Sequence, residues 1–143
     1  MVKFIFHPLW QAAATIISLV AAAEGFRRFR MLHLGHKTTF NWKKHVRWGG
    51  YALAGWLVGW VGGFITVKMN WPGLFVTGPH ALIALIMAPL LVFGLGSGLY
   101  LNRVKKKRQA LPLAHGLNNI VLILLALAQA WTGWRAFTVL VLN

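Results

Sequence analysis

The sequence contains no cysteine and a single acidic residue, Glu24, in 143 residues. Without cysteine the chain forms no disulfide and offers no thiolate to a metal. One carboxylate is too few for paired-acid catalysis, and a Ser-His-Asp arrangement lacks support for the same reason. Zinc, copper and di-iron centres draw on thiolates or carboxylates and therefore fit this composition poorly.

Charge is scarce as well: 11% of the residues are charged, against about 25% in an average soluble protein, while 58% are hydrophobic. Such hydrophobicity excludes a disordered basic tail. A basic nucleic-acid-binding protein spreads its charges over a folded surface, whereas long stretches here carry none, so no nucleic-acid partner is expected. The composition predicts an integral membrane protein, and the length predicts one domain over residues 1–143.

Four stretches are apolar enough over roughly 20 residues to cross a bilayer as helices. Because the connections between them are short, we expect an all-α fold, an up-down-up-down four-helix bundle in the membrane. The predicted spans cover residues 8–26, 47–67, 81–101 and 116–134, with loops from Arg27 to Val46, Lys68 to Gly78 and Asn102 to Ala114.

The fifteen Lys and Arg residues are distributed unevenly over the predicted loops. The positive-inside rule places the two basic loops in the cytoplasm and both termini outside. We interpret most of the +14 charge as this topology signal together with attraction to the anionic lipids of the inner leaflet. Three cations fall on the other side, Lys3, Lys68 and Arg135, and twelve fall in the basic loops: Arg27, Arg28, Arg30, Lys37, Lys43, Lys44, Arg47, Arg103, Lys105, Lys106, Lys107 and Arg108.

Six histidines are present, and four of them stand at the start of a predicted span: His7, His45, His80 and His115. The other two, His33 and His36, fall in the first basic loop, where we expect them to be solvated. In an alternating bundle, the starts of the first and third helices share one side of the membrane, and the starts of the second and fourth share the other. The sequence therefore predicts two pairs, His7 with His80 outside and His45 with His115 inside.

Paired neutral imidazoles inside an apolar bundle suit axial ligation of haem iron. Steps of three or four residues from each His follow faces of mainly small or polar residues. Gly59 and Gly94 lie fourteen residues after His45 and His80, a rise of roughly 21 Å, where a helix passing a porphyrin needs room. The same small faces also suit tight helix packing, and a histidine near a membrane interface is often only hydrogen-bonded there.

On these residues the chain resembles the cytochrome b561 family over essentially all four spans. The resemblance rests on Phe6-His7-Pro8-Leu9, Lys44-His45, Pro79-His80-Ala81 and Ala114-His115-Gly116. It implies a four-helix core with two non-covalent b-type haems, each held by two His from alternate helices. Eukaryotic members have one further helix on each side of the core, so this chain looks more like a compact prokaryotic branch. That resemblance implies a prokaryotic inner membrane and quinol as the more natural donor.

The sequence thus predicts a diheme cytochrome that carries electrons across the membrane, with Arg27, Arg28, Lys43, Lys44 and Arg47 pairing with the propionates of the inner haem. A quinol or another small reductant is the expected donor, and a bound quinone, a redox protein partner and a homodimer stay open. Whether the chain is an oxidoreductase in its own right also stays open. Two alternatives are a haem-bearing membrane anchor subunit of a larger oxidoreductase and a haem-free packing or transport protein.

Overall fold

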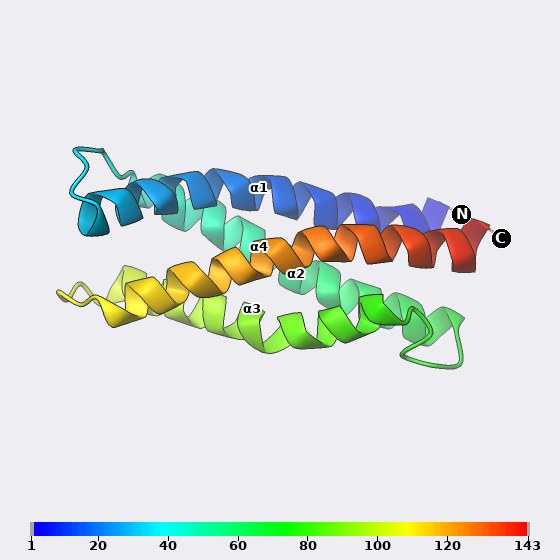
Figure 1. Cartoon of the computed structure of the whole chain (residues 1–143). Helices are drawn as coiled ribbons and strands as arrows, with labels where there is room; N and C mark the ends of the chain where they lie inside the picture. Colours follow the sequence, from blue (N-terminus) through cyan, green and yellow to red (C-terminus); the bar gives the residue numbers. More distant parts are fainter. Residues whose placement is uncertain (1, 143) are drawn as a thin grey trace.

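The computed structural model describes the backbone of residues 2–142 and the side chains of residues 4–142. Over this range the chain forms four α-helices, α1 (Val2–His33), α2 (Trp42–Asn70), α3 (Pro79–Arg103) and α4 (Ala110–Phe137) (Figure 1). A five-residue π-helix, η1 (Thr138–Leu142), continues α4. All four helices are long and apolar enough to cross a membrane.

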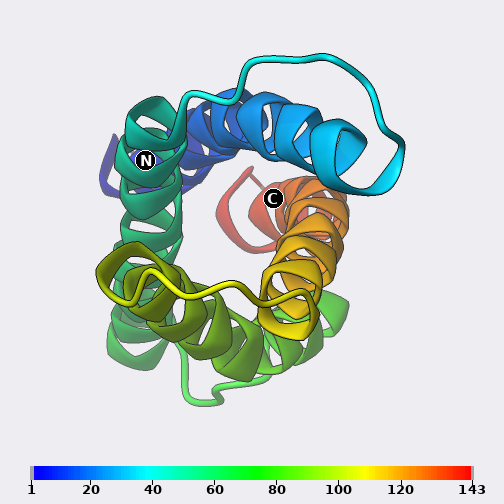
Figure 2. The same cartoon turned by 90° about the vertical axis from the view of Figure 1, so that its left-hand side faces the viewer.

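The helices form an up-down-up-down bundle in which α1 packs on α2, α3 packs on α4, and contacts of α2 with α3 and of α1 with α4 close the ring (Figure 2). Helices α1 and α3 are therefore diagonally opposite, as are α2 and α4. We call the end with the connections 34–41 and 104–109 the basic end, and the end with both chain termini and the connection 71–78 the terminal end (Figure 1).

Local sequence explains where two of the helices begin. At the start of α2 the Asn41 side chain accepts a hydrogen bond from the Lys44 backbone N–H at 3.0 Å, which satisfies a donor that the first turn leaves free. Helix α3 starts with Pro79 in its first turn, where the missing N–H is not needed, and Gly78 precedes it with a φ of 58°.

The helices are longer than the predicted spans, and the predicted loop from Arg27 to Val46 is wrong at both ends. Helix α1 continues to His33 and α2 begins at Trp42, so Arg27, His45 and their neighbours lie on helices. Hydropathy marks only the part of a helix that lies in hydrocarbon. The backbone stays helical beyond it, because long basic side chains extend to the headgroups without breaking the helix.

A small cluster of buried apolar side chains lies midway along the helices, where it separates the two ends of the bundle. This core consists of Ala14, Leu53, Trp56, Met87, Leu91, Leu122 and Ala126. Large apolar side chains such as Leu82, Ile86 and Leu124 are instead more than half exposed on the outer surface. A soluble bundle would place polar residues there, so this distribution matches a bundle surrounded by lipid.

Candidate functional site

The four histidines that begin the predicted spans come together in two pairs inside the bundle. The ring centres of His7 and His80 are 6.3 Å apart at the terminal end, with the ring planes at 85°. Those of His45 and His115 are also 6.3 Å apart at the basic end, with the planes at 76°. These are the pairs that helix alternation predicts, and each joins two diagonally opposite helices.

Each of these rings rests on a glycine of the helix that packs beside its own. A methyl group placed on Gly63 would lie 2.7 Å from His7 Cε1, and one on Gly133 would lie 2.9 Å from His80 Cε1. At the basic end the matching distances are 3.3 Å from Gly25 to His45 and 3.2 Å from Gly98 to His115. In all four cases Cε1 is the nearest ring atom, so the four rings face their glycines with the same edge.

The glycines lie at a constant distance along the chain from the histidines. In every helix the glycine comes eighteen residues after the histidine: Gly25 after His7, Gly63 after His45, Gly98 after His80 and Gly133 after His115. Eighteen residues are five helical turns, so both residues share one face about 27 Å apart. Each helix therefore supplies a ring at one end and a support at the other. The constant spacing was readable in the sequence, but only the fold shows that the support serves another helix's histidine.

The Nδ1 atoms of the rings have different partners. His45 Nδ1 lies 2.9 Å from the Ala21 carbonyl oxygen, and His115 Nδ1 lies 2.8 Å from Ser97 Oγ. At the terminal end His80 Nδ1 is 3.4 Å from Thr132 Oγ1. His7 Nδ1 is buried and makes no hydrogen bond to the described residues. Sequence reasoning named none of these second partners.

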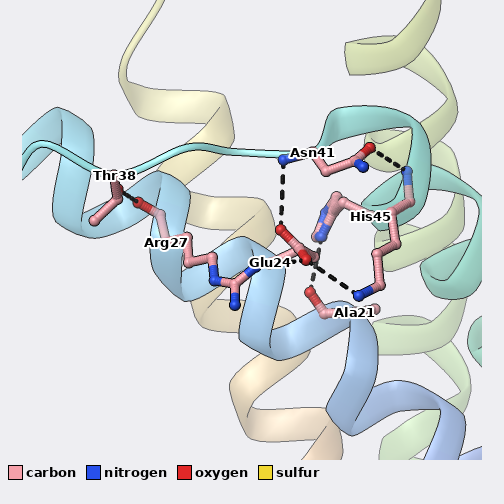
Figure 3. A network of polar contacts seen from close by, with 7 residues as sticks. Ala21, Glu24, Arg27, Thr38, Asn41 and His45 are labelled. Carbon is pink, nitrogen blue, oxygen red and sulfur yellow. Dashed lines mark hydrogen bonds and ion pairs between the residues drawn. The ribbon is translucent and has the colours of Figure 1, made fainter.

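A polar network lies beside His45 of the basic-end pair and centres on Glu24, which is 2% exposed. The Glu24 carboxylate lies 2.9 Å from Arg27 Nη1 and 3.4 Å from Lys44 Nζ, and it also accepts the Asn41 backbone N–H at 3.4 Å (Figure 3). Figure 3 shows His45 beside this carboxylate, with its ring turned to the Ala21 carbonyl. The only acid of the chain thus ties the end of α1 to the start of α2 next to His45.

The basic residues predicted to hold propionates all lie exposed at the basic end. Arg28 stacks over Phe40 at 5.3 Å and Arg47 over Trp48 at 5.5 Å. Lys43 lines an open pocket of about 510 Å³ together with Arg27, Lys44 and Glu24. Phe40 also lines this pocket and contacts the His45 ring, with the ring centres 5.6 Å apart.

Gly59 and Gly94, predicted as gaps for a porphyrin, are buried and face amide side chains. A methyl group on Gly59 would lie 2.6 Å from the Gln11 side chain, and one on Gly94 would lie 3.1 Å from Asn119 Oδ1. Gln11 and Asn119 each stand one helical turn after a paired histidine. That Gly59 and Gly94 leave gaps for a cofactor stays a prediction.

The remaining histidines stay apart from the two pairs. His33 ends α1, where its ring contacts Phe29, and His36 lies in the 34–41 connection within 3.3 Å of Arg30. Both are exposed. On the terminal end, Lys68 and Arg135 lie in the last turns of α2 and α4, while the Lys3 side chain falls outside the described residues.

Each pair has the dimensions needed to hold one metal ion between two imidazoles. A metal–imidazole bond is about 2 Å long, so two rings on opposite sides of one ion have centres about 6 Å apart. Among the described residues no three His, Cys, Asp or Glu side chains come together. The remaining ligands must then come from outside the chain, as they do from the four nitrogens of a porphyrin.

Three buried polar atoms lack hydrogen bonds within the described structure: His7 Nδ1 and Gln11 Oε1 at the terminal end and Asn102 Oδ1 at the basic end. His7 Nδ1 would face away from a metal held by Nε2, so a haem would not satisfy it, and the fit of a haem does not depend on these atoms. The fit rests on the spacing of each ring pair and on the four glycines, which leave room for the rings.

The fold and the two pairs define the class of the protein as a four-helix bundle of membrane-spanning length with two internal histidine pairs. Comparison with protein-family models, with curated proteins and with solved structures finds no match to this chain.

Proposed function

We propose that the chain is a diheme b-type cytochrome that carries electrons across a membrane. One observation carries the proposal: two imidazole pairs with the same 6.3 Å spacing lie at opposite ends of a bundle that is long enough to cross a bilayer. Packing alone requires neither the pairing nor its repetition at both ends. Two redox centres, one near each end, would let an electron cross the membrane in steps.

In this proposal His7 and His80 would hold one haem iron at the terminal end, and His45 and His115 would hold another at the basic end. A bound b-type haem would supply a reversible one-electron couple. The protein's part is to present two imidazoles from opposite helices, each beside a glycine that leaves room for the ring. Because two imidazoles would hold each iron, the sites favour electron transfer over binding of a further ligand.

The exposed cations of the basic end complete the inner site. All five predicted cations are exposed: Arg27, Lys43 and Lys44 line the open pocket beside Glu24, and Arg28 and Arg47 lie outside it. They would pair well with propionates because charge-assisted hydrogen bonds are stronger than neutral ones. By the positive-inside rule the same charges support a basic end in the cytoplasm, against anionic lipid, with both termini outside.

The electron donor follows from resemblance and not from a contact in this structure. The four-histidine pattern resembles the cytochrome b561 family in a compact form, for which we propose quinol as the donor. The acceptor then lies on the opposite face of the membrane. The chain is an oxidoreductase in its own right only if it oxidises quinol without a partner protein.

The direct test is the reduced-minus-oxidised spectrum of the purified full chain, with a haem count per chain. We expect b-type bands and two haems. A colourless protein would overturn the proposal and favour a haem-free packing or transport role. Purification at native expression separates the remaining possibilities, since a single stable chain with quinol activity argues against an anchor subunit, and a larger complex argues for one.

The orientation is tested with single-cysteine variants, because the chain has no cysteine that would add background labelling. Lys37→Cys lies in the 34–41 connection at the basic end, and Leu74→Cys lies in the 71–78 connection at the terminal end. We expect a membrane-impermeant thiol reagent added outside intact cells to label Leu74→Cys and to spare Lys37→Cys. The reverse pattern would overturn the assigned orientation.

A further inference from the structure

Both imidazoles of the basic-end pair have short Nδ1 hydrogen bonds. His45 Nδ1 and His115 Nδ1 lie 2.9 Å and 2.8 Å from their acceptors, which is within the usual hydrogen-bond range. At the terminal end His80 Nδ1 lies 3.4 Å from Thr132 Oγ1, and the His7 and His80 rings approach the backbone of Gly59 and Gln129 without a short hydrogen bond. The difference concerns the ring nitrogen that would face away from a bound metal.

The partners determine which ring nitrogen carries the proton at the basic end. The Ala21 carbonyl can only accept a hydrogen bond, so His45 Nδ1 must be the donor. The Ser97 hydroxyl has one proton, which it donates to the Phe93 carbonyl at 2.6 Å. Ser97 Oγ therefore accepts from His115 Nδ1–H. In both neutral rings Nε2 then carries a free lone pair, which is the form that binds a metal.

Other groups near His115 leave this assignment unchanged. The Asn119 amide nitrogen lies 3.3 Å from Nδ1 and 3.2 Å from Nε2 of the ring. A donor bonded in the ring plane to one nitrogen is much farther from the other, so Asn119 lies off both lone-pair directions. It donates instead to the His115 backbone carbonyl at 2.7 Å. Ser97 is 7% exposed, so water competes little for its hydroxyl.

We infer that Ser97 is a positioning residue of the basic-end site, which holds His115 with Nδ1 protonated and Nε2 free for a metal. This inference rests on the proposed function, because it assigns the metal to haem iron. A hydrogen bond donated by Nδ1–H makes the imidazole a stronger electron donor and stabilises ferric over ferrous iron. Ser97 thus lowers the midpoint potential of the basic-end haem and leaves that of the other haem unchanged.

The chain itself suggests the conservative replacement. Thr132 occupies in α4 the position that Ser97 occupies in α3, directly before the supporting glycine, and it also contacts a histidine Nδ1. Its hydroxyl donates to a carbonyl one turn earlier, that of Ala128. A threonine is therefore compatible with this helix position and with the hydrogen bond. Ser97→Thr keeps the hydroxyl, while Ser97→Ala removes it with little change in volume.

The test is a redox titration of both haems in the purified full chain and in these two variants. In Ser97→Ala we expect the preference for ferric iron at the basic-end haem to fall about tenfold, equivalent to a rise of about 59 mV in its potential. Ser97→Thr should restore the original value. Thr66→Ala is the matched control, because its hydroxyl also bonds a carbonyl one turn earlier, that of Gly62, but lies in the last turns of α2 away from His115.

The outcomes show separately whether the proposed function and the inference about Ser97 hold. A chain without haem bands overturns the proposed function and this inference with it. Two haems whose potentials are the same in Ser97→Ala as in the original chain overturn the inference alone, as do equal shifts at both haems. Ser97→Ala could also lose the basic-end haem. If Ser97→Thr then retains that haem, the result supports the hydrogen bond. If both variants lose it, Ser97 has a packing role and the inference is overturned.

Discussion

The two ends of the bundle present the same ring pair in different surroundings. Both pairs have ring centres 6.3 Å apart, and each ring rests on a glycine. The basic-end pair has two short Nδ1 hydrogen bonds and a buried carboxylate beside it, whereas at the terminal end His80 Nδ1 lies 3.4 Å from Thr132 Oγ1 and His7 Nδ1 makes no short hydrogen bond. Helix geometry therefore sets where the rings lie, and the neighbouring backbone and side-chain groups set how closely each Nδ1 is bonded.

The largest expected effect is the loss of one haem when a paired histidine is removed. His7→Ala or His80→Ala should leave only the basic-end haem, and His45→Ala or His115→Ala only the terminal-end haem, because one imidazole cannot complete an axial pair. Haem counts should fall from two to one. His33→Ala and His36→Ala are the controls and should keep both haems, since these exposed rings lie outside the pairs. Two haems in His7→Ala and His45→Ala would contradict the assignment of the ligands.

A smaller effect is expected from filling the glycine supports, and it should be stronger at the terminal end. Gly63→Ala places a methyl group 2.7 Å from His7, and Gly25→Ala places one 3.3 Å from His45. We expect Gly63→Ala to lose about 1–3 kcal/mol of stability through overpacking, and Gly25→Ala to lose less because a shift of a few tenths of an ångström relieves the contact. Thermal unfolding followed by circular dichroism measures both.

Gly62→Ala is the matched control for these variants, because a methyl group there meets nothing within 4 Å. Alanine is favoured over glycine in a helix by about 1 kcal/mol, so this neighbour of Gly63 should become slightly more stable. Equal losses in Gly62→Ala and Gly63→Ala would show that the glycine does not serve as a support for His7.

The smallest expected effect is that of Glu24→Gln, which keeps the shape of the side chain and removes its charge. The ion pairs with Arg27 and Lys44 are then lost, and the cations of the basic end repel one another more strongly. We expect the melting temperature to fall by about a few degrees, with a larger drop at low salt because salt screens that repulsion. Lys68→Gln removes one charge at the terminal end and should not show this salt dependence. The same salt dependence in Glu24→Gln and Lys68→Gln would contradict a local role for Glu24.

The sequence was sufficient to predict the bundle and the pairing of the histidines, because both depend on periodicity and on alternation of helix direction. It was insufficient for the helix ends: Arg27 and Lys44 continue the helices instead of forming a loop. It also failed to show what surrounds the rings. Ser97 stands directly before the supporting Gly98, as Thr132 does before Gly133, but this position does not say which histidine the hydroxyl meets. Only the distance in the fold shows that the Ser97 hydroxyl meets His115.

The sequence by itself determined that four apolar helices alternate through a membrane-sized bundle, because hydropathy and short loops leave few other folds. It also determined that each helix carries a histidine and, eighteen residues later, a glycine on the same face. The tertiary structure alone decided that each glycine supports the ring of the adjacent helix and that the Ala21 carbonyl and the Ser97 hydroxyl hold the basic-end rings. Those contacts join residues from different helices, and their geometry depends on how the helices are rotated and shifted against one another, which no single helix encodes.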